Sequence, residues 1–189
     1  MTRIFDIVLA SLGFFVLSPV LLVIWVIGWF DNRSPLFRQD RVGRNQVPFV
    51  LVKFRTMRPD TDSVATHLAD ASAITPFGHF LRRTKLDELP QLWNVLRGDM
   101  SLVGPRPCLF NQRELIAHRA AMGVFAARPG ITGLAQVQGI DMSTPELLAK
   151  TDAQMLASLG LVDYFRYIFL TVLGRGAGDR VRRELTGRR

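Results

Sequence analysis

The feature that most restricts the fold is an unbroken apolar run near the N-terminus. Residues 7–30 read IVLASLGFFVLSPVLLVIWVIGWF and contain no charged side chain. A helix of this length can cross the hydrocarbon core of a bilayer. A cleaved signal peptide has a shorter apolar core and a small-residue cleavage site, and neither is found here. The sequence therefore predicts a chain attached to a membrane.

Ser18 and Pro19 interrupt the middle of this run. A proline inside a helix removes one backbone hydrogen bond and costs about 3 kcal/mol unless another group compensates, which the Ser18 hydroxyl can do. The residues leave two topologies for this helix open. One is a kinked helix that spans the membrane. The other is a re-entrant helix, broken at Ser18-Pro19, that leaves by the face it entered, and cations at both flanks (Arg3 and Arg33) favour it.

The charge balance indicates the kind of partner. The chain has 189 residues and a formal net charge of +8, which predicts an anionic partner such as a phosphorylated substrate, an acidic lipid or a nucleic acid. A nucleic acid is not expected, because the interleaving of aromatic and basic residues found on nucleic-acid surfaces is absent. The single cysteine, Cys108, excludes an internal disulfide and a multi-cysteine metal site.

Two adjacent carboxylates, Asp87 and Glu88, lie just before a predicted helix. Pro90 suits the first turn of that helix, and Gly98 suits its end. Acidic residues at a helix N-terminus are commonly ordinary caps. The same pair, beside a cluster of basic residues, would also remain ionised and could take part in phosphate chemistry. The residues alone leave both interpretations open.

Five cations are candidates for binding an anionic substrate. Arg83 and Lys85 directly precede the acidic pair, whereas Lys53 and Arg55 alternate along a strand-like segment and are expected on one face. Arg106 stands between two prolines in a Gly-Pro-Arg-Pro sequence, which would hold its guanidinium on a stiff loop. A solvated sheet edge and a purely structural turn are the alternatives.

Periodicity predicts an α+β fold in which helices dominate, with a few short strands around the acidic pair and amphipathic helices at a membrane surface. Residues 159–173 are too short for a span and are interpreted as a core or an interfacial helix. The expected parts are a membrane helix, a catalytic domain and a basic, disordered tail, over residues 1–32, 33–173 and 174–189.

Several segments together resemble the bacterial sugar transferases, the monotopic polyprenyl-phosphate phosphoglycosyl transferases, in their small single-domain form. The resemblance covers residues 1–173 and is carried by Ser18-Pro19, Asp40-Arg41-Val42-Gly43, residues 53–57 (KFRTM), residues 81–96 (LRRTKLDELPQLWNVL), residues 98–107 (GDMSLVGPRP) and residues 129–137 (PGITGLAQV).

This resemblance implies a reaction and gives each acidic residue a role in it. Asp87 would attack the sugar-bearing phosphorus of a UDP-sugar, UMP would leave, and a polyprenyl phosphate (usually undecaprenyl phosphate) would take the phosphosugar from the aspartyl intermediate. Glu88, with Asp87, would bind Mg²⁺. Arg83, Lys85 and more weakly Lys53 and Arg55 would contact phosphate, and Arg106 would lie near the uridine.

The resemblance also implies a location and leaves one question open. The membrane helix would be re-entrant, in contact with phospholipids of the bacterial inner membrane, and the catalytic domain would lie on the cytoplasmic face. After Gly139 the chain reads Ile140-Asp141, where many relatives have Arg-Asn or Arg-Asp, so the sugar is not identified. A membrane-bound nucleotide-sugar pyrophosphatase and a basic membrane adaptor are the alternative functions.

Overall fold

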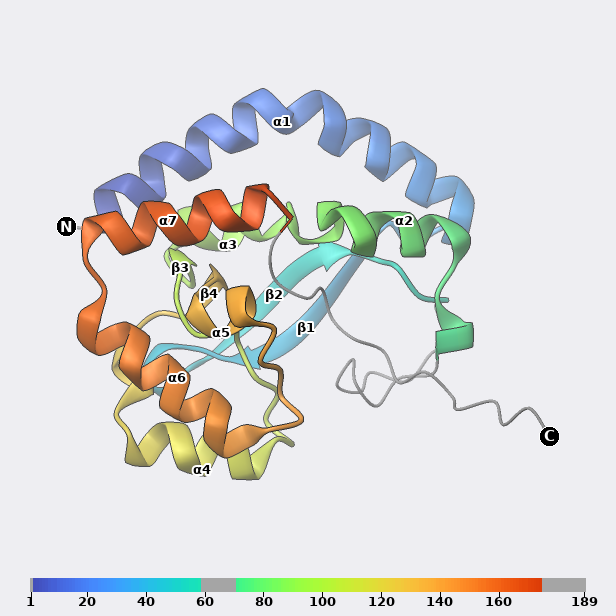
Figure 1. Cartoon of the computed structure of the whole chain (residues 1–189). Helices are drawn as coiled ribbons and strands as arrows, with labels where there is room; N and C mark the ends of the chain where they lie inside the picture. Colours follow the sequence, from blue (N-terminus) through green and yellow to red (C-terminus); the bar gives the residue numbers. More distant parts are fainter. Residues whose placement is uncertain (1, 59–70, 175–189) are drawn as a thin grey trace.

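The computed structural model describes residues 2–58 and 71–174, and it confirms a helix-dominated α+β fold. Figure 1 shows helix α1 arching over the other elements. The helices are α1 (Thr2–Asn32), α2 (Pro76–Thr84), α3 (Gln91–Arg97), α4 (Arg113–Ala121), α5 (Leu134–Gln138), α6 (Pro145–Ser158) and α7 (Leu161–Val172), with 3₁₀ turns η1 (Arg44–Gln46), η3 (Ala71–Ala73), η4 (Leu86–Glu88) and η5 (Val124–Ala126). The strands are β1 (Leu36–Val42), β2 (Pro48–Phe54), β3 (Ser101–Val103) and β4 (Gly130–Thr132).

Helix α1 is bent near its middle but is not interrupted (Figure 1). Pro19 has no N–H, so the carbonyl of Phe15, four residues earlier, loses its helical partner. The Ser18 hydroxyl donates to this carbonyl at 2.7 Å. The serine therefore satisfies the group that the proline leaves unpaired, and the predicted break takes the form of a bend within one helix.

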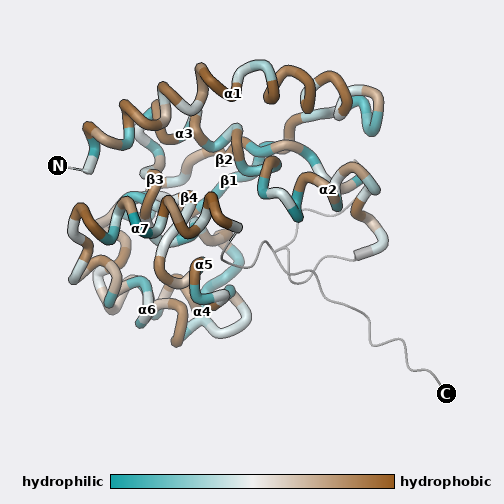
Figure 2. The backbone as a smooth tube through the Cα atoms, turned by 45° about the horizontal axis from the view of Figure 1, so that its top comes forward, coloured by the Kyte–Doolittle hydropathy of each residue, from teal (hydrophilic) through white to brown (hydrophobic). Residues whose placement is uncertain are grey.

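Most of α1 is apolar and exposed. It is long and apolar enough to cross a membrane, and only 11% of its most apolar stretch is buried against the rest of the chain. Figure 2 shows the hydrophobic colouring continuing along much of this helix. Phe15 and Phe30 are at least 80% exposed, which would be costly in water. This surface matches a lipid environment.

Both ends of α1 are bound to the same globular part. At the N-terminal end, buried Asp6 accepts hydrogen bonds from the Ser101 hydroxyl, the Leu102 amide and the Tyr164 hydroxyl, at 2.9, 2.9 and 2.8 Å. At the C-terminal end, the Thr75 hydroxyl donates to Asp31 at 2.8 Å. Both ends of α1 therefore lie on the inner side of the arch, against the globular part.

The two longest strands form an antiparallel hairpin, β1–β2, in which Phe37 pairs with Lys53 and Arg38 pairs with Val52. The free edge of β2 is occupied by buried Asn94 of α3, which accepts from the Val52 amide at 3.0 Å and donates to the Val50 carbonyl at 2.7 Å. One asparagine side chain thus replaces a neighbouring strand over this edge.

Residues 39–45 read QDRVGRN, a polar sequence with a glycine that predicts a turn, but this prediction is wrong in position. Gln39 to Val42 belong to β1, and the chain reverses at residues 43–47 instead. The polar residues Gln39 and Arg41 enter the strand because their side chains are buried and paired, with the Arg41 guanidinium donating to Gln39 at 2.6 Å.

A second, parallel pair of short strands lies beside the hairpin. The chain just after β3 passes so close to β4 that a Cβ on Gly130 would clash with the Gly104 nitrogen, and a Cβ on Gly104 would clash with the Arg128 carbonyl. Only glycine fits both positions. This close approach fixes where the chain leaves β3 into the Gly-Pro-Arg-Pro sequence.

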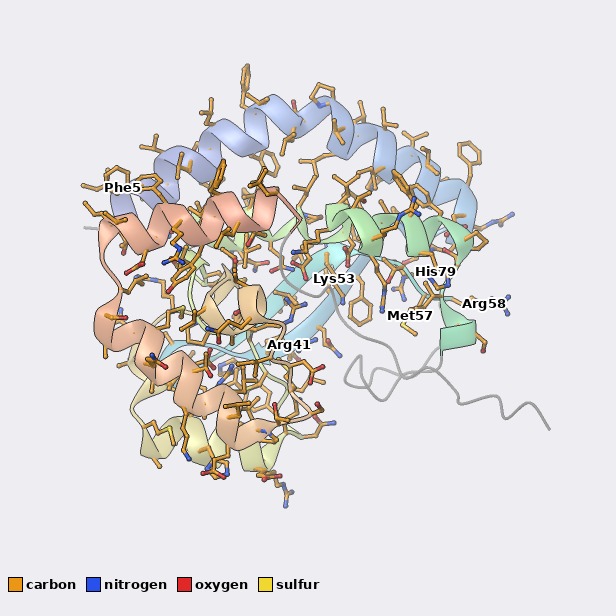
Figure 3. The ribbon with its side chains drawn as sticks, in the orientation of Figure 1. Phe5, Arg41, Lys53, Met57, Arg58 and His79 are labelled. Carbon is orange, nitrogen blue, oxygen red and sulfur yellow. The ribbon has the colours of Figure 1, made fainter. Side chains whose placement is uncertain are left out.

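Helix α7 has two apolar sides. Tyr164 and Tyr167 are buried, and Phe5 of α1 packs edge-on against Phe165 with ring centroids 5.3 Å apart (Figure 3 labels Phe5). The opposite side leaves Val162 and Val172 about 80% exposed. Such a helix suits an interface between protein and lipid. The predicted domain limits stay predictions, and the basic tail lies outside the described residues apart from Gly174.

Candidate active site

The acidic pair lies in the 3₁₀ turn η4, which connects α2 to α3. Thr75 caps α2, because its hydroxyl accepts from the Gly78 amide at 2.9 Å. Lys85 ends this helix in a left-handed conformation (φ 58°), which turns the chain so that Asp87 points inward and is only 6% exposed. Helix α3 then begins at Gln91, after Pro90.

Glu88 is held by the guanidinium of Arg106. The Arg106 Nη2 atom lies 2.7 Å from Glu88 Oε1, and both side chains are partly buried, with 26% and 16% of their surface exposed. Lys85 belongs to the same cluster: desolvation lowers the pKa of its ammonium group, Glu88 raises it and Arg106 lowers it again. Three residues that sequence reasoning proposed separately are thereby brought together.

The Gly-Pro-Arg-Pro loop (residues 104–107) is fixed through its backbone carbonyls. The Pro105 carbonyl accepts from the Gly130 amide at 2.9 Å, and the Arg106 carbonyl accepts from Arg119 at 2.8 Å. The Pro107 carbonyl accepts from Arg41 at 3.0 Å. Because three different elements hold these carbonyls, the backbone that carries the Arg106 side chain is fixed in position.

Arg119, which donates to the Arg106 carbonyl, is also part of a buried ion pair. Arg119 of α4 donates twice to the Oδ2 atom of Asp152 of α6, at 3.0 and 2.6 Å, and both side chains are at most 2% exposed. Burial raises the pKa of Asp152, and the adjacent guanidinium opposes that rise. The neighbouring Cys108 is also buried, and burial raises the pKa of its thiol, which disfavours the reactive thiolate form.

Lys53 and Arg55 share one face of the hairpin, as the alternation predicted. Both cations lie over the ring of Phe37, with the Lys53 nitrogen 5.6 Å and the Arg55 guanidinium carbon 5.4 Å from its centroid. Figure 3 shows Lys53 and Arg41 toward opposite ends of the hairpin. Because η4 packs against β2, the Lys53 end of the hairpin lies beside the acidic turn.

Not every predicted residue joins this cluster. Arg83 lies exposed on the last turn of α2, and none of the contacts described above involves it. Ser18 and Pro19 stay in the bend of α1. Arg55 is only partly available to a substrate, since it also donates to the Ser34 carbonyl at 3.0 Å, and desolvation lowers the pKa of its guanidinium.

The donor set at the acidic turn fits Mg²⁺. This ion is usually held by one or two carboxylates together with substrate phosphates, and Asp87 and Glu88 supply two adjacent carboxylates. Glu88 also contacts Arg106, which leaves its second oxygen for other partners. In the part of the chain that the structure describes, no group of three or more His, Cys, Asp or Glu residues forms a site that could hold a metal by protein ligands alone.

Arg41, Arg119 and Asp152 were missed by sequence reasoning. Neither Arg119 nor Asp152 belongs to a recognisable motif, and 33 residues separate them. A charged residue on the apolar side of a helix is the one available signal, because such a charge is rarely fully buried without a partner. Pairing them across the chain requires the structure.

The assembled site combines a buried carboxylate, a second carboxylate in an ion pair, and cations from three segments. A carboxylate can approach a diphosphate only where nearby positive charge offsets the repulsion. Lys85, Arg106 and Lys53 supply such charge around η4. The arrangement is therefore suited to attack on a phosphoryl group.

Comparison with known proteins adds an independent finding. The family model described as "Bacterial sugar transferase" matches residues 1–175. A protein of Caulobacter vibrioides named UDP-glucose:undecaprenyl-phosphate glucose-1-phosphate transferase is 43% identical over 143 residues, which cover 73% of this chain and 54% of the relative. The UDP-galactose-lipid carrier transferase of Erwinia amylovora is 36% identical over 187 residues, which cover 90% of this chain and 39% of the relative.

A relative of similar length also matches. The exopolysaccharide production protein PSS of Rhizobium leguminosarum bv. phaseoli is 39% identical over 196 residues, which cover 93% of this chain and 96% of that protein. The Caulobacter and Erwinia proteins are longer, and the chain spans roughly two fifths to a half of their length. The family match includes the whole of α1, so the chain is associated with a membrane. It belongs to the bacterial sugar transferase family.

Proposed function

We propose that this chain transfers a sugar phosphate from a UDP-sugar to a polyprenyl phosphate in the membrane, giving polyprenyl-diphosphate-sugar and UMP. The observation that carries the proposal is the acidic turn, where buried Asp87 lies next to the ion pair of Glu88 and Arg106 and to Lys85. The names of the Caulobacter and Erwinia relatives support the same class of reaction.

The proposed first step uses the Asp87 carboxylate as nucleophile. One of its oxygens forms a bond to the sugar-bearing phosphorus, and the bond from that phosphorus to the oxygen of UMP breaks. UMP leaves as a phosphate monoester, and an aspartyl phosphosugar remains. Arg106 and Lys85 would hold the negative oxygens of the diphosphate close to Asp87. Mg²⁺, held by Glu88 with Asp87, would supply further neutralisation of the diphosphate charge.

The proposed second step regenerates the carboxylate. A phosphate oxygen of the polyprenyl phosphate bonds to the phosphorus of the intermediate, and the bond between phosphorus and Asp87 breaks. Because the acceptor replaces the leaving group of the first step, one set of cations serves both transfers. Dividing the reaction in this way is a recognised use of an aspartate nucleophile.

The reaction is tested by screening UDP-sugars for UMP release with Mg²⁺, with and without polyprenyl phosphate. We expect sustained turnover only with the lipid and, without it, a phosphosugar adduct seen by mass spectrometry of the intact chain. Asp87→Asn should abolish both UMP release and the adduct, whereas Glu114→Gln, at an exposed position on α4, should change neither. Sustained turnover without lipid would assign the chain to nucleotide-sugar hydrolysis instead.

We further infer that α1 is re-entrant and that the catalytic part lies on the cytoplasmic face of the bacterial inner membrane. A straight helix of 31 residues is about 46 Å long, more than a bilayer core, so a span would separate its ends. Asp6 and Asp31 instead bond to one globular part. Cations at both flanks also favour a shared cytoplasmic side.

Topology is tested with single cysteines placed at Thr2 and Ser34. The native Cys108 is buried, and its thiol pKa is raised by that burial, so it should give little background labelling. In oriented vesicles, both introduced cysteines should react with an impermeant maleimide from the same, cytoplasmic side. Labelling from opposite sides would mean that α1 spans the bilayer.

A further inference from the structure

A cavity of about 700 Å³ lies beneath the bend of α1. Phe14, Leu21 and Trp25 line it from the helix. The β1–β2 hairpin and α3 close its other sides, with Val52 and Trp93 among the lining residues. This volume is within the range of about 300–1,000 Å³ found for pockets that hold small organic ligands. Because α1 is a membrane helix, the cavity is accessible to lipid.

The lining is apolar except at a few positions, two of which are arginines. Arg38 of β1 and Arg97 at the end of α3 both border the cavity. Arg97 is more than half exposed and lies 3.5 Å from Asp99, and within the described residues no carboxylate pairs with Arg38. An apolar cavity bordered by two arginines complements a molecule with a hydrocarbon chain and an anionic phosphate.

The β1–β2 hairpin separates this cavity from the candidate active site. Val52 lines the cavity, whereas its neighbour Lys53 lies over Phe37 on the opposite face of the same strands. A phosphate held by Arg38 would therefore stand on the far face from Lys53. The acceptor phosphate must reach Asp87, so this cavity does not suit a reacting acceptor.

We propose that the cavity binds one anionic glycerophospholipid, with an acyl chain beneath the bend of α1 and its phosphate on Arg38 and Arg97. The lipid fills the space between the membrane helix and the hairpin. It thereby supports the bend where the cavity separates α1 from the hairpin. Binding of a lipid depends only on the membrane association of the chain, whereas the exclusion of the acceptor rests on the proposed reaction at Asp87.

The experiment measures lipid retention by the full-length chain. The purified, delipidated chain in detergent is given equal amounts of phosphatidylglycerol and phosphatidylcholine, and bound lipid is counted by native mass spectrometry. We expect one retained phosphatidylglycerol per chain, with phosphatidylcholine retained about tenfold less, as two cations near a lipid phosphate imply. The double variant Arg38→Gln/Arg97→Gln should lose that preference. The matched control Arg113→Gln, at an exposed position on α4, should keep it.

A second variant tests the cavity itself. Val50 lines it and is 43% exposed, so Val50→Trp should fill part of the space without disturbing the core. This variant should lose the retained phosphatidylglycerol even though both arginines remain. Equal retention by all variants would overturn the proposal. Displacement of phosphatidylglycerol by one equivalent of polyprenyl phosphate would also overturn it, because it would assign the cavity to the acceptor. Neither result depends on catalytic activity, so a failed transferase assay would leave this test intact.

Discussion

The loop that carries Arg106 and the turn that carries Asp87 meet at one ion pair, but they are held in different ways. The turn is stabilised by local bonds, such as those from the Glu88 amide to the Lys85 carbonyl at 3.2 Å and from the Leu89 amide to the Leu86 carbonyl at 3.3 Å. The loop is held by donors from β1, α4 and β4.

This difference separates two tasks. A short local turn can place a reactive carboxylate using only the residues around it. A rigid loop can present a guanidinium with little ordering cost when substrate binds, but it needs support from the whole fold. Changes in the support of the loop should therefore affect stability and activity together. Changes at the ion pair itself should affect activity alone.

The largest expected effect comes from Arg119→Met. This change leaves Asp152 buried without its partner, which should lower the free energy of unfolding by about 3–5 kcal/mol. It also removes the donor to the Arg106 carbonyl, so UMP release should fall. Chemical denaturation in detergent and the UMP assay measure the two effects.

The double variant Arg119→Met/Asp152→Leu separates these two effects. Replacing both charges by apolar side chains of similar size should recover most of the stability. The Arg106 carbonyl still lacks its donor, so activity should stay low. Full recovery of activity would mean that the ion pair contributes packing only and does not position the loop.

An intermediate effect is expected for Arg106→Gln. Loss of a hydrogen bond to a charged group is worth about 1.5–3 kcal/mol, so kcat/KM for the UDP-sugar should fall by about 10- to 100-fold. The unfolding free energy should change by less than about 1 kcal/mol, because the pair with Glu88 is partly accessible to solvent. Arg106→Lys should restore only part of the activity, since a lysine lacks the planar fork of donors. A loss of stability as large as that of Arg119→Met would mean that the ion pair supports the fold as much as the buried pair of Arg119 and Asp152 does.

The smallest effect is expected for Lys85→Arg and concerns pH. Desolvation lowers the pKa of Lys85, so its positive charge is lost at a lower pH than in a free lysine. If this charge helps to bind the diphosphate, kcat/KM should decline as pH rises through that lowered pKa. An arginine stays charged over this range, so the decline should move to higher pH while activity near neutrality changes only a few-fold. If kcat/KM of Lys85→Arg declined at the same alkaline pH as in the unchanged chain, another group would be responsible for the decline.

Local chemistry made the acidic turn and its helices predictable from the sequence. Thr75 caps α2, Gly98 ends α3 in a left-handed conformation and Ser18 satisfies the carbonyl freed by Pro19, and each depends on residues a few positions apart. The shared face of Lys53 and Arg55 follows in the same way from strand alternation.

The tertiary support of the loop could not be predicted in this way. Arg41 bonds to the Pro107 carbonyl across 66 positions, and Asp6 bonds to the Leu102 amide across 96. No periodic pattern marks such pairs. The same long-range pairing explains the misplaced turn, because Gln39 and Arg41 look like loop residues until their buried partners are known. The cavity beneath α1 could not be predicted either, because its size depends on the angle of the bend in α1.

The attachment of α1 at both ends has a consequence for how the chain meets bilayers of different thickness. A spanning helix adapts to a thicker or thinner membrane by tilting. On the re-entrant topology proposed above, a helix fastened through Asp6 and Asp31 cannot tilt without breaking one of these contacts. The distance from the bend of α1 to Asp87 is then independent of the thickness of the bilayer. Hydrophobic mismatch, which sorts many spanning proteins among membranes, would therefore not change the tilt of α1.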